Sequence, residues 1–210
     1  IYISEKTLAT TDEDSIYFID VRPGLSQYTL DSQSLTESII APTSTQSWRN
    51  LLLYGDRLYF LTYETGDAQI YRYSSSDLES ATASSWIKSK ESNLSEAIDF
   101  AIDGTVFVLL TNGELKRFVS GSEVSWSQGV VEPSMTNATD LWTDVDSEHL
   151  YILEPEQERL VIFEKETGEF LVQYKSGLFS QATSFSVDES TRSIFLMIDS
   201  KIYTIAASHL

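Results

Sequence analysis

A short apolar segment recurs five times in this chain at a nearly constant spacing, and this repeat restricts the fold more than any other feature. The five copies are SIYFID (15–20), RLYFLTY (57–63), TVFVLLT (105–111), HLYILE (149–154) and SIFLMID (193–199). Their aromatic residues are Tyr17, Tyr59, Phe107, Tyr151 and Phe195. Subtraction of these numbers gives spacings of 42, 48, 44 and 44 residues. Such a period is typical of a chain that repeats one supersecondary unit.

A second set of segments keeps the same period. Its members are QYTLD (27–31), QIYRYS (69–74), ELKRFV (114–119), RLVIFE (159–164) and KIYTIA (201–206). Both sets are short, rich in Val, Ile, Leu, Tyr and Phe, and bounded by Asp, Gly or Ser, which is typical of β-strands. A third set lies upstream of each pair and a less regular fourth set downstream. The repeat therefore predicts units of four strands and about 44 residues, the size of one β-propeller blade.

The two ends of the chain predict how the array closes. After KIYTIA (201–206) only residues 207–210 remain, too few for another strand and its turn. At the other end, IYI (1–3) precedes the first innermost strand and has no other evident partner. Closure of a propeller removes the free sheet edges that an open array exposes. We therefore expect an all-β propeller of five four-stranded blades, closed by pairing of the N-terminal strand into the last blade.

We expect a single domain over residues 1–210. Its five blades are predicted at about 4–45, 46–91, 92–133, 134–177, and 178–210 together with 1–3. The Ser-rich segment SSSDLESATASS (74–85) is interpreted as an insertion within the second blade rather than as a linker. Two alternatives stay open: an open part of a propeller with six or seven blades, and another all-β arrangement such as two packed sheets.

The charge balance excludes two classes of partner. The chain has 14 Lys plus Arg against 32 Asp plus Glu, which gives a formal net charge of −18. Binding to phosphate backbones and to anionic lipid headgroups depends on Lys and Arg. We therefore expect no nucleic-acid partner and no direct membrane binding, and we expect the partner to be a protein or a small ligand. The chain has no cysteine, which excludes disulfides and thiolate metal sites.

The fourth repeat resembles one blade of an NHL-type propeller. The matching positions are Asp146, Leu150, Tyr151, Ile152, Glu154, Arg159, Leu160, Ile162, Phe163 and Gly168. The same pattern occurs in propellers of the NHL, YncE-like and TolB-like kinds, so the resemblance implies the fold and says little about function. NHL domains that bind RNA have a basic face, and this acidic chain cannot supply one.

The last third of the chain carries a second resemblance. From Glu132-Pro133 through Asn137-Ala138-Thr139 to the C-terminus it is similar to the C-terminal propeller domains of bacterial 2C-type phosphatase-like proteins. In those proteins the propeller is attached beyond a membrane segment. The resemblance implies an extracytoplasmic sensing or protein-interaction domain of a longer, membrane-anchored protein. The chain begins at Ile1 without an initiator Met, and we expect it to be processed or cut from a longer protein.

A ring of polar residues is the predicted binding site. Alignment of the innermost strands places Asn50, Asp99, Asp140 and Ser184 at one equivalent position, with Lys6 as the fifth member. Propellers bind at the mouth of the central channel, where these strands converge. Oxygen ligands suit Ca²⁺ and Mg²⁺, so Asp99 and Asp140 are the candidate metal ligands. The alternative is that these side chains satisfy backbone groups at a wet channel end.

The pattern Asp144-x-Asp146-x-Glu148 lacks the Gly and the distal Glu of a calcium loop. We therefore interpret the acidic hairpins DVDSE (144–148) and DES (188–190) as solvated turns. The two histidines, His149 and His209, are predicted in a turn and at the C-terminus, an arrangement that predicts no catalytic triad. We therefore predict a non-enzymatic binding or scaffold module, monomeric as a domain and without a cofactor other than Ca²⁺ or Mg²⁺. One alternative is a small-ligand or divalent-cation receptor. A more distant one is a glycosidase that uses Asp99 and Asp140.

Overall fold

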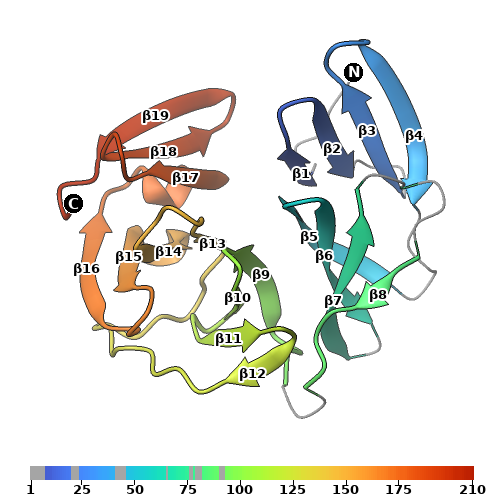
Figure 1. Ribbon diagram of the computed structural model, residues 1–210. Helices are drawn as coiled ribbons and strands as arrows, with labels where there is room; N and C mark the ends of the chain where they lie inside the picture. Colours follow the sequence, from blue (N-terminus) through green and yellow to red (C-terminus); the bar gives the residue numbers. More distant parts are fainter. Residues whose placement is uncertain are drawn as a thin grey trace. The chain divides into compact units, whose positions relative to one another are not determined.

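The computed structural model describes residues 8–19, 24–40, 46–64, 66–75, 78, 82–89 and 93–210. Here the chain is all-β, with strands β1 to β19 and two short 3₁₀ helices, η1 (Pro155–Gln157) and η2 (Phe179–Gln181). The strands form five antiparallel sheets, which are the blades of a β-propeller (Figure 1). The predicted fold class is confirmed. The chain divides into two compact units, Ile1–Ser95 and Glu96–Leu210, and each is described by itself.

The first unit contains two four-stranded sheets in chain order. The first sheet consists of β1 (Leu8–Thr11), β2 (Ser15–Ile19), β3 (Leu25–Thr29) and β4 (Ser34–Ile40). The second consists of β5 (Gln46–Tyr54), β6 (Arg57–Glu64), β7 (Asp67–Ser74) and β8 (Ser84–Ser85). Their innermost strands, β1 and β5, lie against each other. A shared core includes Tyr17, Leu25, Leu51, Leu58 and Phe60.

The second unit contains three sheets. The first has β9 (Ala97–Ile102), β10 (Val106–Leu110), β11 (Leu115–Val119) and β12 (Ser122–Val124). The next has β13 (Asp140–Trp142), β14 (His149–Glu154), β15 (Arg159–Glu164) and β16 (Phe170–Lys175). The last has β17 (Ser184–Asp188), β18 (Ser193–Ile198) and β19 (Lys201–Ala206). The innermost strand β13 contacts both β9 and β17, so these sheets follow one another around their inner strands.

The second strand of a blade is buried on both faces because sheets pack against both sides of it. All five residues of β10 are buried, and β14 is buried from Leu150 onward. A strand that is covered on both faces reads as a continuous apolar run instead of an alternating one. One core fills the space between the β9–β12 and β13–β16 sheets, and a second core that between the β13–β16 and β17–β19 sheets. This burial explains why the second strand carries the clearest repeat in the sequence.

The last sheet has three strands in the described part of the chain, in agreement with the prediction that it lacks an outer strand of its own. The segment IYI (1–3), which we expect to complete it, lies outside the described residues. The closure of the array and the assignment of one domain to residues 1–210 therefore stay predictions.

A buried ion pair fastens the segment 132–137 to the middle of the β13–β16 sheet. Arg159 and Glu154 are both fully buried, and the Arg159 Nη2 lies 2.6 Å from the Glu154 Oε2. The same Nη2 donates to the Pro133 carbonyl at 2.8 Å. The other oxygen of Glu154 accepts the backbone N–H groups of Thr136 and Asn137 at 2.7 and 3.2 Å. The pair is stable in this dry site because additional hydrogen bonds satisfy the remaining donors and acceptors.

Replacing Glu154 with Ala is expected to destabilise the protein strongly. The change leaves the Arg159 charge buried without its partner, which costs about 3–5 kcal/mol of unfolding free energy. Urea unfolding of Glu154→Ala measures this loss. Glu169→Ala is the matched control, because Glu169 is exposed, lies outside the segment 132–137, and its loss is expected to cost less than about 0.5 kcal/mol. Equal stability of the two variants would contradict the stabilising role of the buried ion pair between Glu154 and Arg159.

Candidate functional site

The three ring candidates of the second unit occupy the same register in their sheets. Each pairs with an apolar residue of the next strand, Asp99 with Leu109, Asp140 with Leu153 and Ser184 with Met197. In the first unit Asn50 on β5 pairs in the same manner with Leu61. Lys6 lies outside the described residues. That these side chains form one ring with a common ligand stays a prediction.

Asp99 links two sheets with its carboxylate. Asp99 belongs to β9 and is buried, with 7% of the residue exposed. One oxygen accepts the N–H of the next residue, Phe100, at 2.8 Å, and the other accepts the N–H of Leu141 on β13 at 2.7 Å. Asn50 repeats the local part of this pattern, since its Oδ1 accepts the N–H of Leu51 at 2.6 Å. Both Asp99 oxygens therefore serve the backbone, as in the alternative interpretation of the ring.

The neighbouring candidates differ from Asp99 in their surroundings. Burial raises the pKa of the Asp140 carboxyl, and a hydrogen bond from Thr139 opposes this rise. Ser184 is exposed. In the part of the chain that the structure describes, no group of three or more His, Cys, Asp or Glu side chains is arranged to hold a metal ion.

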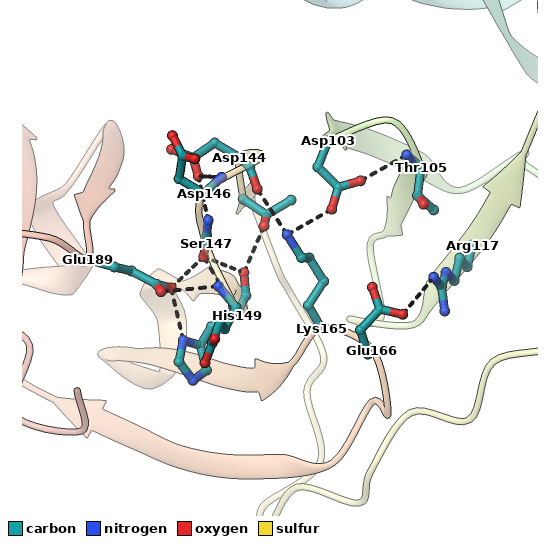
Figure 2. A network of polar contacts seen from close by, with 12 residues as sticks. Asp103, Thr105, Arg117, Asp144, Asp146, Ser147, His149, Lys165, Glu166 and Glu189 are labelled. Atoms are coloured by element: carbon teal, nitrogen blue, oxygen red, sulfur yellow. Dashed lines mark hydrogen bonds and ion pairs between the residues drawn. The ribbon is translucent and has the colours of Figure 1, made fainter.

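Glu189, in the turn between β17 and β18, is the centre of a polar network (Figure 2). Its Oε1 accepts hydrogen bonds from the Ser147 hydroxyl and from the Tyr151 hydroxyl, the latter at 2.9 Å. The same oxygen lies 2.9 Å from the His149 Nδ1. Its Oε2 accepts the N–H of Glu148 at 3.1 Å. Burial disfavours ionisation of Glu189, but these hydrogen bonds outweigh burial and hold its pKa below the usual range. The network joins the last sheet to the β13–β14 turn.

His209 extends the network toward the C-terminus. Its Nε2 lies 3.0 Å from the Tyr151 hydroxyl, and its Nδ1 lies 2.9 Å from the hydroxyl of Tyr174 on β16. The rings of His149 and His209 meet edge to face, with centroids 5.2 Å apart. Burial and the nearby Glu189 raise the pKa of Tyr151. The sequence analysis did not bring the two histidines together, because 60 positions separate them by subtraction of their numbers.

The network does not have the arrangement of a serine nucleophile and its base. The Ser147 hydroxyl donates to Glu189 and to the His149 carbonyl at 3.0 Å, and it accepts the His149 backbone N–H. No hydrogen bond joins it to the imidazole of His149 among the described contacts. A nucleophile needs a base that takes its proton. In this geometry Ser147 holds the turn.

A second contact joins the same turn to the neighbouring sheet. The ammonium group of Lys165 lies 2.8 Å from an Asp103 oxygen and donates to the Asp144 carbonyl at 3.0 Å (Figure 2). Both side chains are more than nine-tenths buried. Asp103 belongs to the β9–β10 turn and Lys165 follows β15. The β13–β14 turn is therefore held from both neighbouring sheets.

A pocket of about 620 Å³ lies between the β13–β14 and β17–β18 turns. It is lined by Asp144, Asp146, Ser147, Glu148, Val187, Asp188, Glu189 and Ser190. The structure thus brings together the two acidic hairpins that the sequence analysis treated as separate solvated turns. The Asp144 carboxylate accepts the N–H groups of Asp146 and Ser147. The Asp146 and Glu148 side chains are exposed and make no side-chain hydrogen bond within the described part of the chain.

No protein-family model and no curated protein matches the chain. Solved structures share its fold. A chain in the crystal structure of a nidogen/laminin complex has a TM-score of 0.60 and 8% identity, over 81% of this chain and 64% of that one. A protein of unknown function from Bacteroides caccae has a TM-score of 0.63 and 9% identity, over 100% of this chain and 81% of that one. Apo AztD from Citrobacter koseri has a TM-score of 0.51 and 14% identity, over 80% of this chain and 46% of that one.

These similarities show the fold alone, because all three identities are low. The chain covers less than two thirds of the nidogen/laminin chain and of AztD. The similar structures support the β-propeller fold and do not distinguish propellers of the NHL, YncE-like and TolB-like kinds. Among the described residues, no helix has the length and apolar character needed to cross a membrane.

Asp99→Asn is expected to lower the unfolding free energy by about 1–3 kcal/mol, because one buried N–H loses its acceptor and faces an amide donor. Asp140→Asn is the control. It removes a charge that burial disfavours, so its stability at pH 7 is expected to equal or exceed that of the wild type. This advantage fades as the pH falls through the raised pKa of Asp140, where the wild-type carboxyl becomes neutral in the folded state.

Urea unfolding of both variants, with chelator and then with Ca²⁺ or Mg²⁺, measures these effects. We expect no gain from either ion, since the backbone already uses both Asp99 oxygens. A metal-induced gain that is present in the wild type and absent from both variants would establish a cation site instead.

Proposed function

We propose that this chain is a non-catalytic binding module of a larger protein and that its partner is a protein with a basic contact surface. The observation that carries the proposal is the acidic pocket between the β13–β14 and β17–β18 turns. Its rim carries the exposed carboxylates of Asp146 and Glu148, and Val187 contributes an apolar wall. The net charge of −18 attracts a cationic surface at long range and accelerates its association.

The hydrogen bonds of the buried carboxylates argue against catalysis. Asp99, Glu154 and Glu189 each accept backbone N–H groups. A glycosidase needs one carboxyl that gives a proton to the leaving group and a second that attacks or activates water. Asp99 is held in a buried position by two hydrogen bonds from backbone N–H groups, which favours a structural role over proton transfer.

Two further parts of the proposal rest on resemblance. The similar chain in the nidogen/laminin structure belongs to a protein complex, which supports protein binding as a use of this fold. The similarity of the last third of the chain to propellers attached beyond a membrane segment supports an extracytoplasmic location in a longer, membrane-anchored protein. We propose membership of the NHL, YncE-like or TolB-like group because the fourth repeat resembles their blade pattern and the chain has the β-propeller fold.

Binding of a fluorescein-labelled, unstructured Lys/Ser peptide, followed by fluorescence anisotropy, tests the acidic pocket. The Asp146→Asn/Glu148→Gln variant is expected to bind this peptide about tenfold more weakly, which corresponds to about 1.4 kcal/mol. The charge-matched control is Glu169→Gln/Asp199→Asn, which removes two exposed carboxylates of the same unit outside the pocket.

The control is expected to bind as tightly as the wild type, and a matching Glu/Ser peptide is expected not to bind. The same loss of affinity in both variants would mean that the peptide responds to net charge alone, and the pocket would lose its role.

A further inference from the structure

One ammonium group of the chain already joins the turns of two neighbouring sheets, β9–β12 and β13–β16. The Nζ of Lys165 lies 2.8 Å from the Oδ2 of Asp103 and donates to the Asp144 carbonyl at 3.0 Å, and Figure 2 shows both contacts. The other oxygen of Asp103, Oδ1, accepts the N–H of Thr105 at 2.9 Å. One carboxylate oxygen of Asp103 therefore holds its own turn, and the second binds an ammonium group.

The repeat places equivalent carboxylates in the next sheets. Asp103, Asp144 and Asp188 each lie four positions after one of the three ring candidates of this unit, which share one register. Asp144 is therefore to the β17–β19 sheet what Asp103 is to the β13–β16 sheet. Asp188 corresponds in the same way to Asp144, the residue whose carbonyl accepts the second hydrogen bond of Lys165.

The repeat also identifies the residue that corresponds to Lys165. Lys165 directly follows β15, and Ala207 directly follows β19. Their backbone N–H groups make the same bond to the preceding strand pair, Lys165 to the Glu148 carbonyl and Ala207 to the Arg192 carbonyl, each at 2.9 Å. Alanine has no side-chain donor. Between the β13–β16 and β17–β19 sheets, the chain itself therefore supplies no ammonium group at the position equivalent to Lys165.

The carboxylate of Asp144 has the same local arrangement as that of Asp103. Its Oδ1 accepts the N–H of Asp146 at 3.0 Å and that of Ser147 at 2.8 Å, so this oxygen holds the β13–β14 turn. Within the described part of the chain, no hydrogen bond or ion pair reaches its Oδ2. Asp144 is exposed, whereas the Asp103 side chain is more than nine-tenths buried. Asp144 and Asp188 both line the acidic pocket.

The other carboxylates of the pocket wall favour a cation as well. Hydrogen bonds from Ser190 and Thr191 hold the pKa of Asp188 below its usual range. Burial opposes ionisation of Glu189, but its hydrogen bonds also leave its pKa below the usual range. Val187 adds an apolar side chain to the same wall. A lysine side chain combines a charged end with an apolar stem, so its chemistry matches both parts of this lining.

We propose that the acidic pocket binds the ammonium group of a lysine side chain of the partner protein, which donates to the Oδ2 of Asp144 as Lys165 donates to the Oδ2 of Asp103. This inference rests on the proposed function, because it names the chemical group of the basic partner that enters the pocket. The site requires N–H donors in addition to positive charge, since the hydrogen bonds of Lys165 are its template.

Two labelled peptides of equal charge separate hydrogen bonding from charge. One is the Lys/Ser peptide, and the other carries Nε-trimethyllysine at every lysine position, which keeps the positive charge and removes all N–H donors of the side chain. We expect the wild type to bind the trimethylated peptide about tenfold more weakly in fluorescence anisotropy, because that peptide cannot donate to Asp144.

Asp144→Asn tests the carboxylate with little change to the turn, because the amide oxygen can still accept the N–H groups of Asp146 and Ser147. This variant is expected to bind the Lys/Ser peptide about tenfold more weakly than the wild type and to bind both peptides equally. Glu169→Gln, which removes one exposed carboxylate outside the pocket, is the charge-matched control and is expected to keep the preference for lysine. Urea unfolding checks that both variants are folded.

The results distinguish the lysine site from the proposed function. Equal affinity of the wild type for the two peptides, with both weakened in Asp146→Asn/Glu148→Gln, would overturn the lysine site and leave the proposed function in place. A preference for lysine that persists in Asp144→Asn would overturn the role of Asp144. Failure of the wild type to bind either peptide would overturn the proposed function and the lysine site together.

Discussion

Carboxylates that accept backbone N–H groups across elements hold the second unit together. Asp99 on β9 accepts the Leu141 N–H, Glu154 on β14 accepts the Thr136 N–H, and Glu189 beside β17 accepts the Glu148 N–H. Hydrogen bonds to an ionised acceptor are shorter and stronger than neutral ones, and each contributes roughly 1.5–3 kcal/mol. They act where the blade ladders cannot, because strands of different blades do not pair. Packing fills the space between sheets, and these bonds fix which backbone atoms face each other.

The same interaction divides the acidic residues into two groups. Carboxylates such as Asp99 and Glu154 are buried and satisfied by the fold. Others, such as Asp146 and Glu148, stay exposed at the rim of the pocket between two turns. The excess of Asp and Glu is therefore not a single property of the surface. Of its buried part, Asp99 joins β9 to β13 and Glu154 holds the segment 132–137 on β14. Its exposed part is available to a cationic partner.

The blade pattern was predictable because it is local. Strands buried on both faces, such as β10 and β14, read as apolar runs in the sequence, and the period of these runs predicted five sheets. The register of Asp99, Asp140 and Ser184 was predictable for the same reason. Their hydrogen bonds were not, because Leu141 lies 42 positions from Asp99 and no local pattern pairs them. The network of Glu189 and His209 joins the β13–β14 turn, β14, β16, the β17–β18 turn and the segment around His209. Its one sequence signal is the proximity of His149 and Tyr151 in a strand, where alternate side chains share a face.

Amide hydrogen exchange of Leu141, Thr136 and Glu148 in the wild-type protein tests the structural role of the carboxylates most directly. Each of these N–H groups has a carboxylate acceptor, Asp99, Glu154 and Glu189 respectively. The account predicts that all three exchange as slowly as the amides within the β14–β15 ladder, since they open only when the elements that they join separate. Exchange at the rate of exposed turn amides would show that the carboxylates do not hold these groups, and the account of how neighbouring sheets are fixed would be contradicted.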